Sequence, residues 1–293
     1  MVEVLVGPAS KELGIKVAQE LNLQPIIVES KVFPDGESYI RVPEEKIDKE
    51  LILIQSTHPP QNKHLIELFL MLDVAKDLGA EKIIAIVPYL AYARQDKRFR
   101  PGEAISVKAL AKLIKEAGAD KFVTFNIHKE EILRFFNIAS INLSGGSAIG
   151  EYFIQKGVSN PYVVAPDKGA YNLALEVSKV LNCECTYFEK ERDRVTGAVK
   201  TEFKKLNVKN KTVIIVDDII STGLTIINVA KILKAQGTEK IYAACIHPIL
   251  IGDAQNKMRV AGVDEVLGTD CIPSEVSKIT VSKILAEALR KEL

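Results

Sequence analysis

The chain carries almost no excess charge of either sign. Its 293 residues include 39 lysines and arginines against 38 aspartates and glutamates, which gives a formal net charge of +1. A near-neutral chain lacks the overall basic character that nucleic acids and anionic membranes attract, so neither is expected as a partner. With 47% apolar and 26% charged residues, the composition also argues against intrinsic disorder.

Long apolar runs and cysteines are scarce as well. No apolar stretch approaches the ~18 residues of a membrane-spanning helix. Residues 1–7 alternate like a strand and lack the basic start and long apolar core of a secretion signal. The four cysteines, Cys183, Cys185, Cys245 and Cys271, are too scattered for a disulfide framework or a CxxC…CxxC zinc site. These absences predict a reduced, cytoplasmic protein.

What the sequence does contain is a regular alternation of short β-branched runs and amphipathic helical patterns. The runs that predict buried strands are 51–54, 83–87, 122–125, 162–165 and 213–216. The stretches that repeat apolar residues at helical spacing are 63–78, 105–117, 170–181 and 224–235. Strands so continuously apolar are typical of a mostly parallel sheet with helices on both faces. The pattern therefore predicts an α/β protein.

One pattern recurs where a helix leads into a strand. Residues 76–85 and 234–243 are identical at six of ten positions, and looser copies lie at 115–124 and around Gly262. Each copy combines a basic helix end with a glycine that can take the left-handed C′ conformation, followed by a strand. Two explanations stay open. Helix-to-strand turns converge on such residues, or a whole domain was duplicated.

Duplication is favoured for 76–85 and 234–243, because the similarity continues through a strand, a helix and a second strand. The two domains would then comprise residues 1–145 and 146–293, divided near the small residues 144–147 (Ser-Gly-Gly-Ser). The same four residues would also suit a phosphate-binding or helix-capping loop, and the sequence alone leaves these alternatives open.

The strongest candidate site follows the predicted strand 213–216. The strand leads into two adjacent carboxylates, Asp217 and Asp218, then into a Ser/Thr/Gly turn at 221–225 where a helix begins near Leu224. Free backbone N–H groups at a helix N-terminus, with nearby hydroxyls, favour a phosphate. The carboxylates would repel that phosphate, so they are predicted to hold sugar hydroxyls or a divalent cation. Together these features predict a ribose 5-phosphate site, against the alternative of an acidic N-cap that merely ends a strand.

This site resembles the ribose-phosphate loop of type I phosphoribosyltransferases and ribose-phosphate pyrophosphokinases. Further motifs, which run from about residue 3 to about residue 290, are similar to those of the pyrophosphokinases and follow in that family's order. These motifs are Phe33-Pro34-Asp35-Gly36-Glu37, Gln55-Ser56-Thr57, Pro88-Tyr89-Leu90-Ala91-Tyr92-Ala93-Arg94-Gln95-Asp96, His128, Pro166-Asp167-Lys168-Gly169 and Lys190-Glu191-Arg192. The resemblance implies two related phosphoribosyltransferase-type α/β domains, with ATP on the first and the ribose 5-phosphate loop on the second. It also allows the last helix to pack back on the first domain.

The activity that the resemblance implies is transfer of the β,γ-diphosphate of ATP to the 1-hydroxyl of ribose 5-phosphate. The products are phosphoribosyl diphosphate, used in nucleotide biosynthesis, and AMP. The resemblance also implies Mg²⁺ as cofactor and a homo-oligomer whose adenine site is shared between subunits. Two alternatives remain at this point. A phosphoribosyltransferase would leave residues 1–140 unexplained, and a non-catalytic regulatory member should have lost some of the site residues.

The resemblance assigns the site residue by residue. Lys190 and Arg192 would be catalytic, because fixed positive charge stabilises the transferred phosphoryl group; taken alone, this segment would be a solvated turn. The residues assigned to ATP are Phe33, Asp35, Gly36, Glu37, Arg94, Gln95 and Asp96. The residues assigned to ribose 5-phosphate are Arg192, Asp217, Asp218, Ser221, Thr222, Gly223, Leu224 and Thr225. The residues assigned to the metal are His128 and Asp167. The remaining histidines, His58, His64 and His247, are expected to be structural or surface residues.

Three positions depart from the family's usual pattern. Ser221 stands where the family usually has aspartate, and serine suits the same turn. Leu224 replaces a small residue or glycine, so it should need an ordinary helical backbone and a place to pack. Glu191 replaces the middle arginine of a Lys-Arg-Arg run, while the two basic residues with assigned roles remain.

Overall fold

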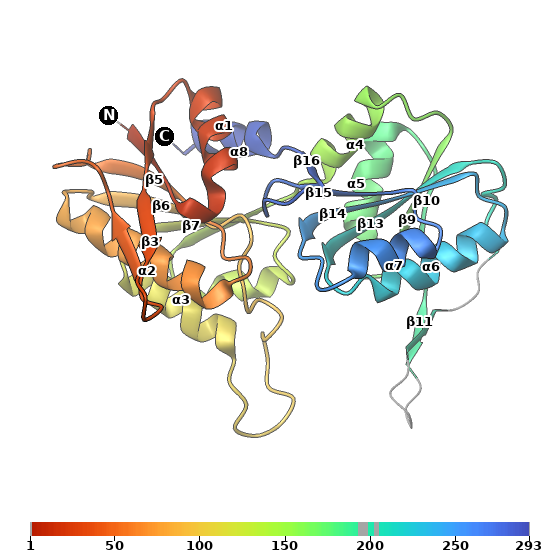
Figure 1. Cartoon of the computed structure of the whole chain (residues 1–293), viewed down its shortest axis with the longest axis horizontal. Coiled ribbons are helices and arrows are strands. Elements are labelled where there is room, and N and C mark those ends of the chain that lie inside the picture. The colour runs from red at the N-terminus through yellow and green to blue at the C-terminus, as the bar shows by residue number, and fades with distance from the viewer. Residues whose placement is uncertain (1, 193–198, 202–204, 293) are drawn as a thin grey trace. The chain divides into compact units, whose positions relative to one another are not determined.

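The apolar runs of the sequence form the strands of two six-stranded sheets, one in each of two units (Figure 1). The computed structural model describes residues 2–192, 199–201 and 205–292, with the backbone alone for 190–192 and 199–201. One unit comprises residues 1–143, 271–273 and 280–293, and the other comprises 144–270 and 274–279. The units therefore differ from the continuous halves 1–145 and 146–293, because the C-terminal residues are part of the first unit.

The first unit is built on a sheet with strand order β2-β1-β5-β6-β7-β8. Its strands are β1 (Val2–Val6), β2 (Pro25–Ile27), β5 (Glu50–Ile54), β6 (Lys82–Ile86), β7 (Lys121–Phe125) and β8 (Ala139–Leu143), with a separate hairpin of β3 (Glu29–Val32) and β4 (Ser38–Arg41). Its helices are η1 (Pro8–Ser10), α1 (Lys11–Leu21), α2 (Gln61–Asp77), α3 (Ser106–Glu116), η2 (Glu130–Phe135) and α8 (Ser282–Arg290). The last of these, α8, packs against α1 and buries Leu285, Ala286 and Leu289.

The second unit repeats this plan with strand order β10-β9-β13-β14-β15-β16. Its strands are β9 (Pro161–Ala165), β10 (Cys185–Tyr187), β13 (Thr212–Ile220), β14 (Lys240–Pro248), β15 (Glu265–Thr269) and β16 (Ser277–Ile279), with a separate hairpin of β11 (Lys190–Arg192) and β12 (Val199–Thr201). Its helices are α4 (Gly146–Gln155), α5 (Tyr171–Leu181), α6 (Leu224–Ala235) and α7 (Ala254–Val260). In both units every pair of neighbouring strands in the six-stranded sheet is parallel.

The sequence repeat has a physical basis in the two units. Lys76, near the end of α2, pairs with Asp120 at 2.8 Å, and Asp120 also accepts a hydrogen bond from the backbone N–H of Ile83. In the second unit Lys234 pairs with Asp264 at 3.3 Å, and Asp264 accepts from the backbone N–H of Ile241. Each lysine therefore ties the end of its helix to the starts of the following strands. The repeated residues make equivalent contacts in the two sheets.

Glycine is required at the helix-to-strand turns that the side chains of Lys76 and Lys234 cross. Gly118 and Gly262 have φ angles of 124° and 101°, a region that side chains disfavour. A Cβ atom there would also lie 2.8 Å from Lys76 in the first unit and 2.7 Å from Lys234 in the second. The backbone conformation and the crowding both select glycine, so the glycines are part of the same repeated contact.

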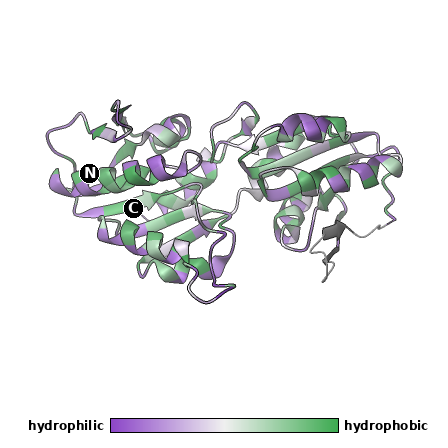
Figure 2. Ribbon diagram, turned by 60° about the horizontal axis from the view of Figure 1, so that its bottom comes forward, coloured by the Kyte–Doolittle hydropathy of each residue, from purple (hydrophilic) through white to green (hydrophobic). Residues whose placement is uncertain are grey.

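Burial follows the prediction of parallel sheets covered on both faces. Ile52, Leu53 and Ile54 of β5 and residues 213–216 of β13 have no exposed surface. Figure 2 shows the strands in hydrophobic colours, whereas the helices alternate hydrophobic and hydrophilic sides. Within the described part of the chain, no helix is long and apolar enough to cross a membrane. These observations confirm the predicted α/β fold class.

Candidate active site

The acidic end of β13 is where the structure departs most from the predicted strand. The sequence ends the apolar run at Val216, but β13 continues through Asp217 and Asp218 to Ile220, because these residues stay in register with β14. The Asp217 carboxylate accepts from the backbone N–H of Asp218 at 3.0 Å, and Asp218 accepts from that of Ile219 at 2.8 Å. The two carboxylates are thus held against the backbone at the carboxyl end of a central strand, where α/β proteins bind ligands.

Asp167 lies beyond the end of the neighbouring strand β9. Its carboxylate accepts from the backbone N–H groups of Gly169 at 2.8 Å and Ala170 at 3.3 Å, just before α5 begins. The pKa of Asp217 is raised well above its ordinary value, first by burial, then by the charge and hydrogen bonding of Asp218, and further by the charge of Asp167. The structure therefore places three of the predicted site carboxylates, from two adjacent strands, near enough to interact electrostatically.

The turn that follows matches the predicted phosphate loop in its backbone. Gly223 has φ 74°, and α6 begins at Leu224 as expected. A Cβ at Gly223 would lie 3.1 Å from Met258 of α7. Both the positive φ and this close contact therefore favour glycine in the turn. Leu224 has the expected helical backbone but is 62% exposed, so the expectation that it packs is wrong. At the first position of a helix its side chain points away from the core, and bulk is tolerated.

The catalytic pair of the prediction lies on the second hairpin. The backbone of Lys190 and Arg192 belongs to β11, which pairs antiparallel with β12, and Glu191 is opposite Lys200. The hairpin forms a two-stranded sheet of its own, apart from the six-stranded one. The side chains of Lys190 and Arg192 lie outside the described residues, so their predicted contacts stay predictions.

In the first unit, Asp96, which is assigned to ATP, lies near His128, which is assigned to the metal, in the loops that follow β6 and β7. Asp96 forms an ion pair with Lys129 at 2.6 Å, and this lysine, with a smaller effect of His128, lowers the pKa of Asp96 below its usual range. His128, Arg94 and Gln95 are exposed, and the hydroxyl of Ser106 hydrogen-bonds the amide oxygen of Gln95. The sequence reasoning missed Lys129, although its position directly after His128 was the available signal.

The Phe33-to-Glu37 motif forms the tip of the β3–β4 hairpin, as its Pro-Asp-Gly turn predicts. The Asp35 carboxylate accepts from the backbone N–H of Glu37 at 3.2 Å, and Gly36 takes a φ of 98°. Phe33 is 39% exposed, and the Lys31 ammonium lies 5.0 Å from its ring centroid. The tip thus presents an exposed aromatic ring beside charged residues within the first unit.

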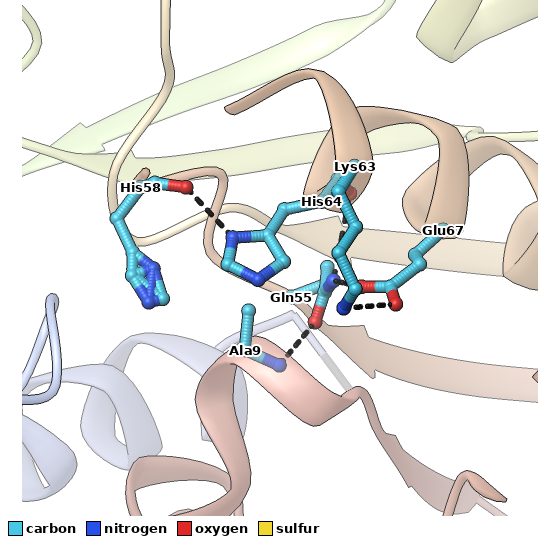
Figure 3. A network of polar contacts seen from close by, with 6 residues as sticks. All are labelled: Ala9, Gln55, His58, Lys63, His64 and Glu67. Atoms are coloured by element: carbon cyan, nitrogen blue, oxygen red, sulfur yellow. Dashed lines mark hydrogen bonds and ion pairs between the residues drawn. The ribbon is translucent and has the colours of Figure 1, made fainter. Parts of the chain in front are cut away.

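A buried polar network holds the loop that follows β5 (Figure 3). Gln55 accepts from the backbone N–H of Ala9 at 3.0 Å and donates to the buried Glu67 of α2 at 3.3 Å, while Lys63 pairs with Glu67 at 2.6 Å. The imidazole of His64 donates from Nδ1 to the carbonyl of His58 at 2.7 Å. In the first unit this loop has the position in the sheet that the predicted phosphate loop has in the second unit.

The histidines without assigned roles are buried rather than at the surface. His58 and His64 stack with ring centroids 4.5 Å apart, and His247 lies inside the second unit. Their description as structural residues fits these positions, whereas a surface location is wrong for all three. For His247 the apolar residues 243–246 carried the signal of burial, whereas the polar and proline neighbours of His58 gave none.

We expect stability to fall in weak acid because of His58. Burial, and then the neighbouring His64, lower the pKa of His58 from 6.5 to about 4. Between pH 6.5 and pH 4, His58 is therefore protonated in the unfolded chain and neutral in the folded chain. The free energy of unfolding consequently decreases as pH falls through this range. The loss between pH 7.5 and pH 5 should be about 2 kcal/mol.

The measurement is urea unfolding from pH 7.5 to pH 5 for the wild type and for His58→Gln, which cannot titrate. The difference between the two free energies of unfolding isolates His58 from His64, whose pKa is also lowered by burial. Parallel pH curves for the two proteins would contradict the assignment.

Two family models match the chain in succession. The model described as the N-terminal domain of ribose phosphate pyrophosphokinase matches residues 2–118, and that of the phosphoribosyl transferase domain matches residues 140–276. Over almost its whole length the chain is 44% identical to the ribose-phosphate pyrophosphokinase of Methanobrevibacter smithii, covering 98% of this chain and 99% of that protein.

The chain belongs to the ribose-phosphate pyrophosphokinase family. Other full-length relatives include the ribose-phosphate pyrophosphokinase of Methanothermobacter thermautotrophicus, 43% identical over 96% of this chain and 98% of that protein. Among solved structures, phosphoribosylpyrophosphate synthetase from Mycobacterium smegmatis is similar with a TM-score of 0.85 and 28% identity, covering 99% of this chain and 98% of that one. The predicted family, fold and enzyme class, a ribose-phosphate diphosphokinase, are confirmed.

The side chains of this pyrophosphokinase do not by themselves form a complete metal site in the described part of the chain. Among the residues that the structure describes, no three histidine, cysteine, aspartate or glutamate side chains gather into a metal site. The acidic edge of the second unit nevertheless suits a hard cation, because the charges of Asp218 and Asp167 already disfavour the ionised form of Asp217. Mg²⁺ commonly binds through one or two carboxylates together with substrate phosphates and water, which such an edge can provide.

Proposed function

We propose that this pyrophosphokinase works in the cytoplasm and divides its substrates between its units, with ATP on the first and ribose 5-phosphate on the second. The observation that carries the proposal is the acidic end of β13, where Asp217 and Asp218 precede the N-terminus of α6. Carboxylates accept hydrogen bonds from hydroxyl groups, and the backbone N–H groups beside them donate to a phosphate, so the two together suit one ligand that carries both groups. A ribose 5-phosphate is such a ligand.

In this proposal Asp217 and Asp218 bind the 2- and 3-hydroxyls of the ribose. The hydroxyl donors would favour the ionised carboxylates that burial and mutual repulsion now disfavour. The 5-phosphate binds at the turn, where the first N–H groups of α6 and the helix dipole favour an anion. The phosphate-binding residues are Ser221, Thr222, Gly223, Leu224 and Thr225.

ATP binds on the first unit in this proposal. Arg94, Gln95 and Asp96 stand at the carboxyl ends of β6 and β7 beside His128, and the exposed ring of Phe33 stacks on adenine with Asp35, Gly36 and Glu37 around it. We assign the Phe33 hairpin to the adenine site of a neighbouring subunit, which makes the enzyme a homo-oligomer. Mg²⁺ ions would be held together with the substrate phosphates, one by His128 of the first unit and a second by Asp167 of the second unit, and would supply positive charge to the diphosphate.

The reaction forms one bond and breaks one bond at the β-phosphorus of ATP. The 1-hydroxyl oxygen of the ribose attacks this phosphorus, its proton passes to solvent, and the bond between the β-phosphorus and the oxygen that bridges to the α-phosphate breaks. AMP leaves with that oxygen. Lys190 and Arg192 stabilise the negative charge on the transferred group, which is the main contribution a protein makes to such transfers.

The test is AMP formation by the purified protein with ATP and Mg²⁺, with and without ribose 5-phosphate. We expect AMP only when the sugar phosphate is present, in equal amount to phosphoribosyl diphosphate. A parallel assay supplies phosphoribosyl diphosphate with adenine, guanine or uracil and measures release of inorganic diphosphate, the product of a phosphoribosyltransferase. Diphosphate release without AMP formation in the first assay would replace the proposed function with that alternative.

A further inference from the structure

The buried hydroxyl of Thr57 is hydrogen-bonded to the start of the loop that carries Arg94, Gln95 and Asp96. Thr57 has no exposed surface, and its Oγ1 donates to the carbonyl of Tyr89 at 2.9 Å while it accepts from the backbone N–H of Ala91 at 2.8 Å. The backbone N–H of Thr57 donates to the same Tyr89 carbonyl at 2.9 Å. One side chain thus closes both ends of the turn by which the chain leaves β6.

Thr57 is itself firmly placed. The residues before it, Gln55 and Ser56, are completely buried, with Gln55 tied to Ala9 and Glu67 (Figure 3) and the Ser56 N–H donating to the hydroxyl of Ser10 at 2.8 Å. The position of Tyr89 and Ala91 is therefore transmitted from the packed loop after β5.

A second tie holds the same turn at the surface. Tyr92 takes a left-handed backbone conformation with φ 62°, which side chains seldom adopt without support. Its hydroxyl donates to the amide oxygen of Asn62 in α2 at 2.6 Å, and its carbonyl accepts from the backbone N–H of Gln95 at 3.0 Å. Tyr92 thus connects the turn held by Thr57 to the backbone of Gln95.

We propose that Thr57, assisted by Tyr92, is a positioning residue for ATP, which fixes the direction in which Arg94 and Gln95 leave the sheet. The inference rests on the proposed role of these two residues in binding ATP. Thr57 touches no substrate in this scheme. Its hydroxyl acts through the backbone of Tyr89 and Ala91, and ribose 5-phosphate binding in the second unit does not depend on it.

The experiment compares Thr57→Val with Thr124→Val. Valine keeps the shape of threonine and removes the hydroxyl, which at position 57 leaves the buried N–H of Ala91 without its acceptor. Thr124 is a matched control, because it is 1% exposed in β7 of the same unit and its hydroxyl has no hydrogen-bond partner among the described residues. The measurements are KM for each substrate, kcat, and ATP binding by calorimetry.

We expect Thr57→Val to raise KM and Kd for ATP about tenfold or more and to leave KM for ribose 5-phosphate nearly unchanged. Thr57→Ser should restore both values, and Thr124→Val should resemble the wild type. If Thr57→Val weakens both substrates equally, or behaves like Thr124→Val, the proposal is wrong.

Tyr92→Phe keeps the test decisive if Thr57→Val does not fold. Tyr92 is 37% exposed, so loss of its hydroxyl leaves the core intact. The expected result is again weaker ATP binding alone, and wild-type ATP binding would overturn the proposal. A wild-type protein that forms no AMP but binds ATP would contradict the proposed function, while the comparison of ATP binding among these variants would still decide the role of Thr57.

Discussion

Asp217→Asn should make the ligand-free enzyme more stable and its binding of ribose 5-phosphate much weaker. The raised pKa of Asp217 means that the fold prefers the neutral acid. The stability that this preference contributes is complete below the unfolded pKa of 3.8 and is lost as pH rises through the folded pKa. Near neutral pH, Asp217 therefore leaves the fold less stable than a neutral side chain of the same shape would. Asparagine has the same shape, carries no charge, and can still accept from the N–H of Asp218.

Thermal unfolding without substrates or metal should therefore show a rise in Tm of a few degrees, about 3–6 °C. The KM for ribose 5-phosphate should rise about 10- to 100-fold, since a hydrogen bond to a charged group is lost, while the KM for ATP changes little. The double variant Asp217→Asn with Asp218→Asn should extend both effects. Equal weakening of the two substrates would contradict the division of labour between the units.

Asp73→Asn is the matched control for stability. Asp73 is exposed on α2, so removal of its charge should leave both Tm and the two KM values unchanged. A Tm for Asp217→Asn at or below that of the wild type would show that the carboxylate is not strained in the free enzyme.

Lys190→Ala should lower kcat about 1000-fold with little effect on stability, because removal of a fixed charge from a phosphoryl-transfer site typically has an effect of this size. Stability should hold because β11 pairs with β12 in a two-stranded sheet separate from the six-stranded one. The measurements are steady-state kinetics of AMP formation and thermal unfolding of the same preparations.

Lys200→Ala provides the control for the charge of the hairpin as a whole. Lys200 is on the partner strand β12, opposite Glu191, and has no assigned role. Its removal changes the net charge of the hairpin by the same amount as Lys190→Ala and should leave kcat within about twofold of the wild type. An equal decrease of kcat in the two variants would show that Lys190 acts only through the overall charge of the hairpin. Near-normal kcat in Lys190→Ala would show that Lys190 has no catalytic role.

Local patterns in the sequence were sufficient for most of the fold. Helix α6 begins at Leu224 and ends at Ala235 as predicted, because the preceding glycine and the apolar spacing fix both ends of the helix locally. The repeated Lys-x-x-Gly pattern indicated two related units, and the equivalent ion pairs of Lys76 and Lys234 give the reason. Here the same residues determine both the local conformation and the contact that follows.

The motif order, too, was readable in the sequence. The motifs of the predicted site lie in loops that follow strands, on a hairpin tip or on a short hairpin strand, and these positions follow largely from local turn chemistry. What the sequence left open was which of these ends stand side by side. The approach of Asp167 to Asp217 depends on β9 and β13 being neighbours in the sheet, and that of Asp96 to Lys129 depends on the loops that follow β6 and β7.

The sequence by itself determined the elements, their period and the residue types of the site, because each depends on neighbours a few positions away. Only the tertiary structure decided that β13 extends through the aspartates, that α8 packs on the first unit, and that Thr57 hydrogen-bonds the turn that precedes Arg94. Each of these rests on a partner more than 25 residues away in the chain. An apolar stripe needs an apolar surface to pack against, and a buried hydroxyl needs a hydrogen-bond partner. The folded chain determines which residues supply them.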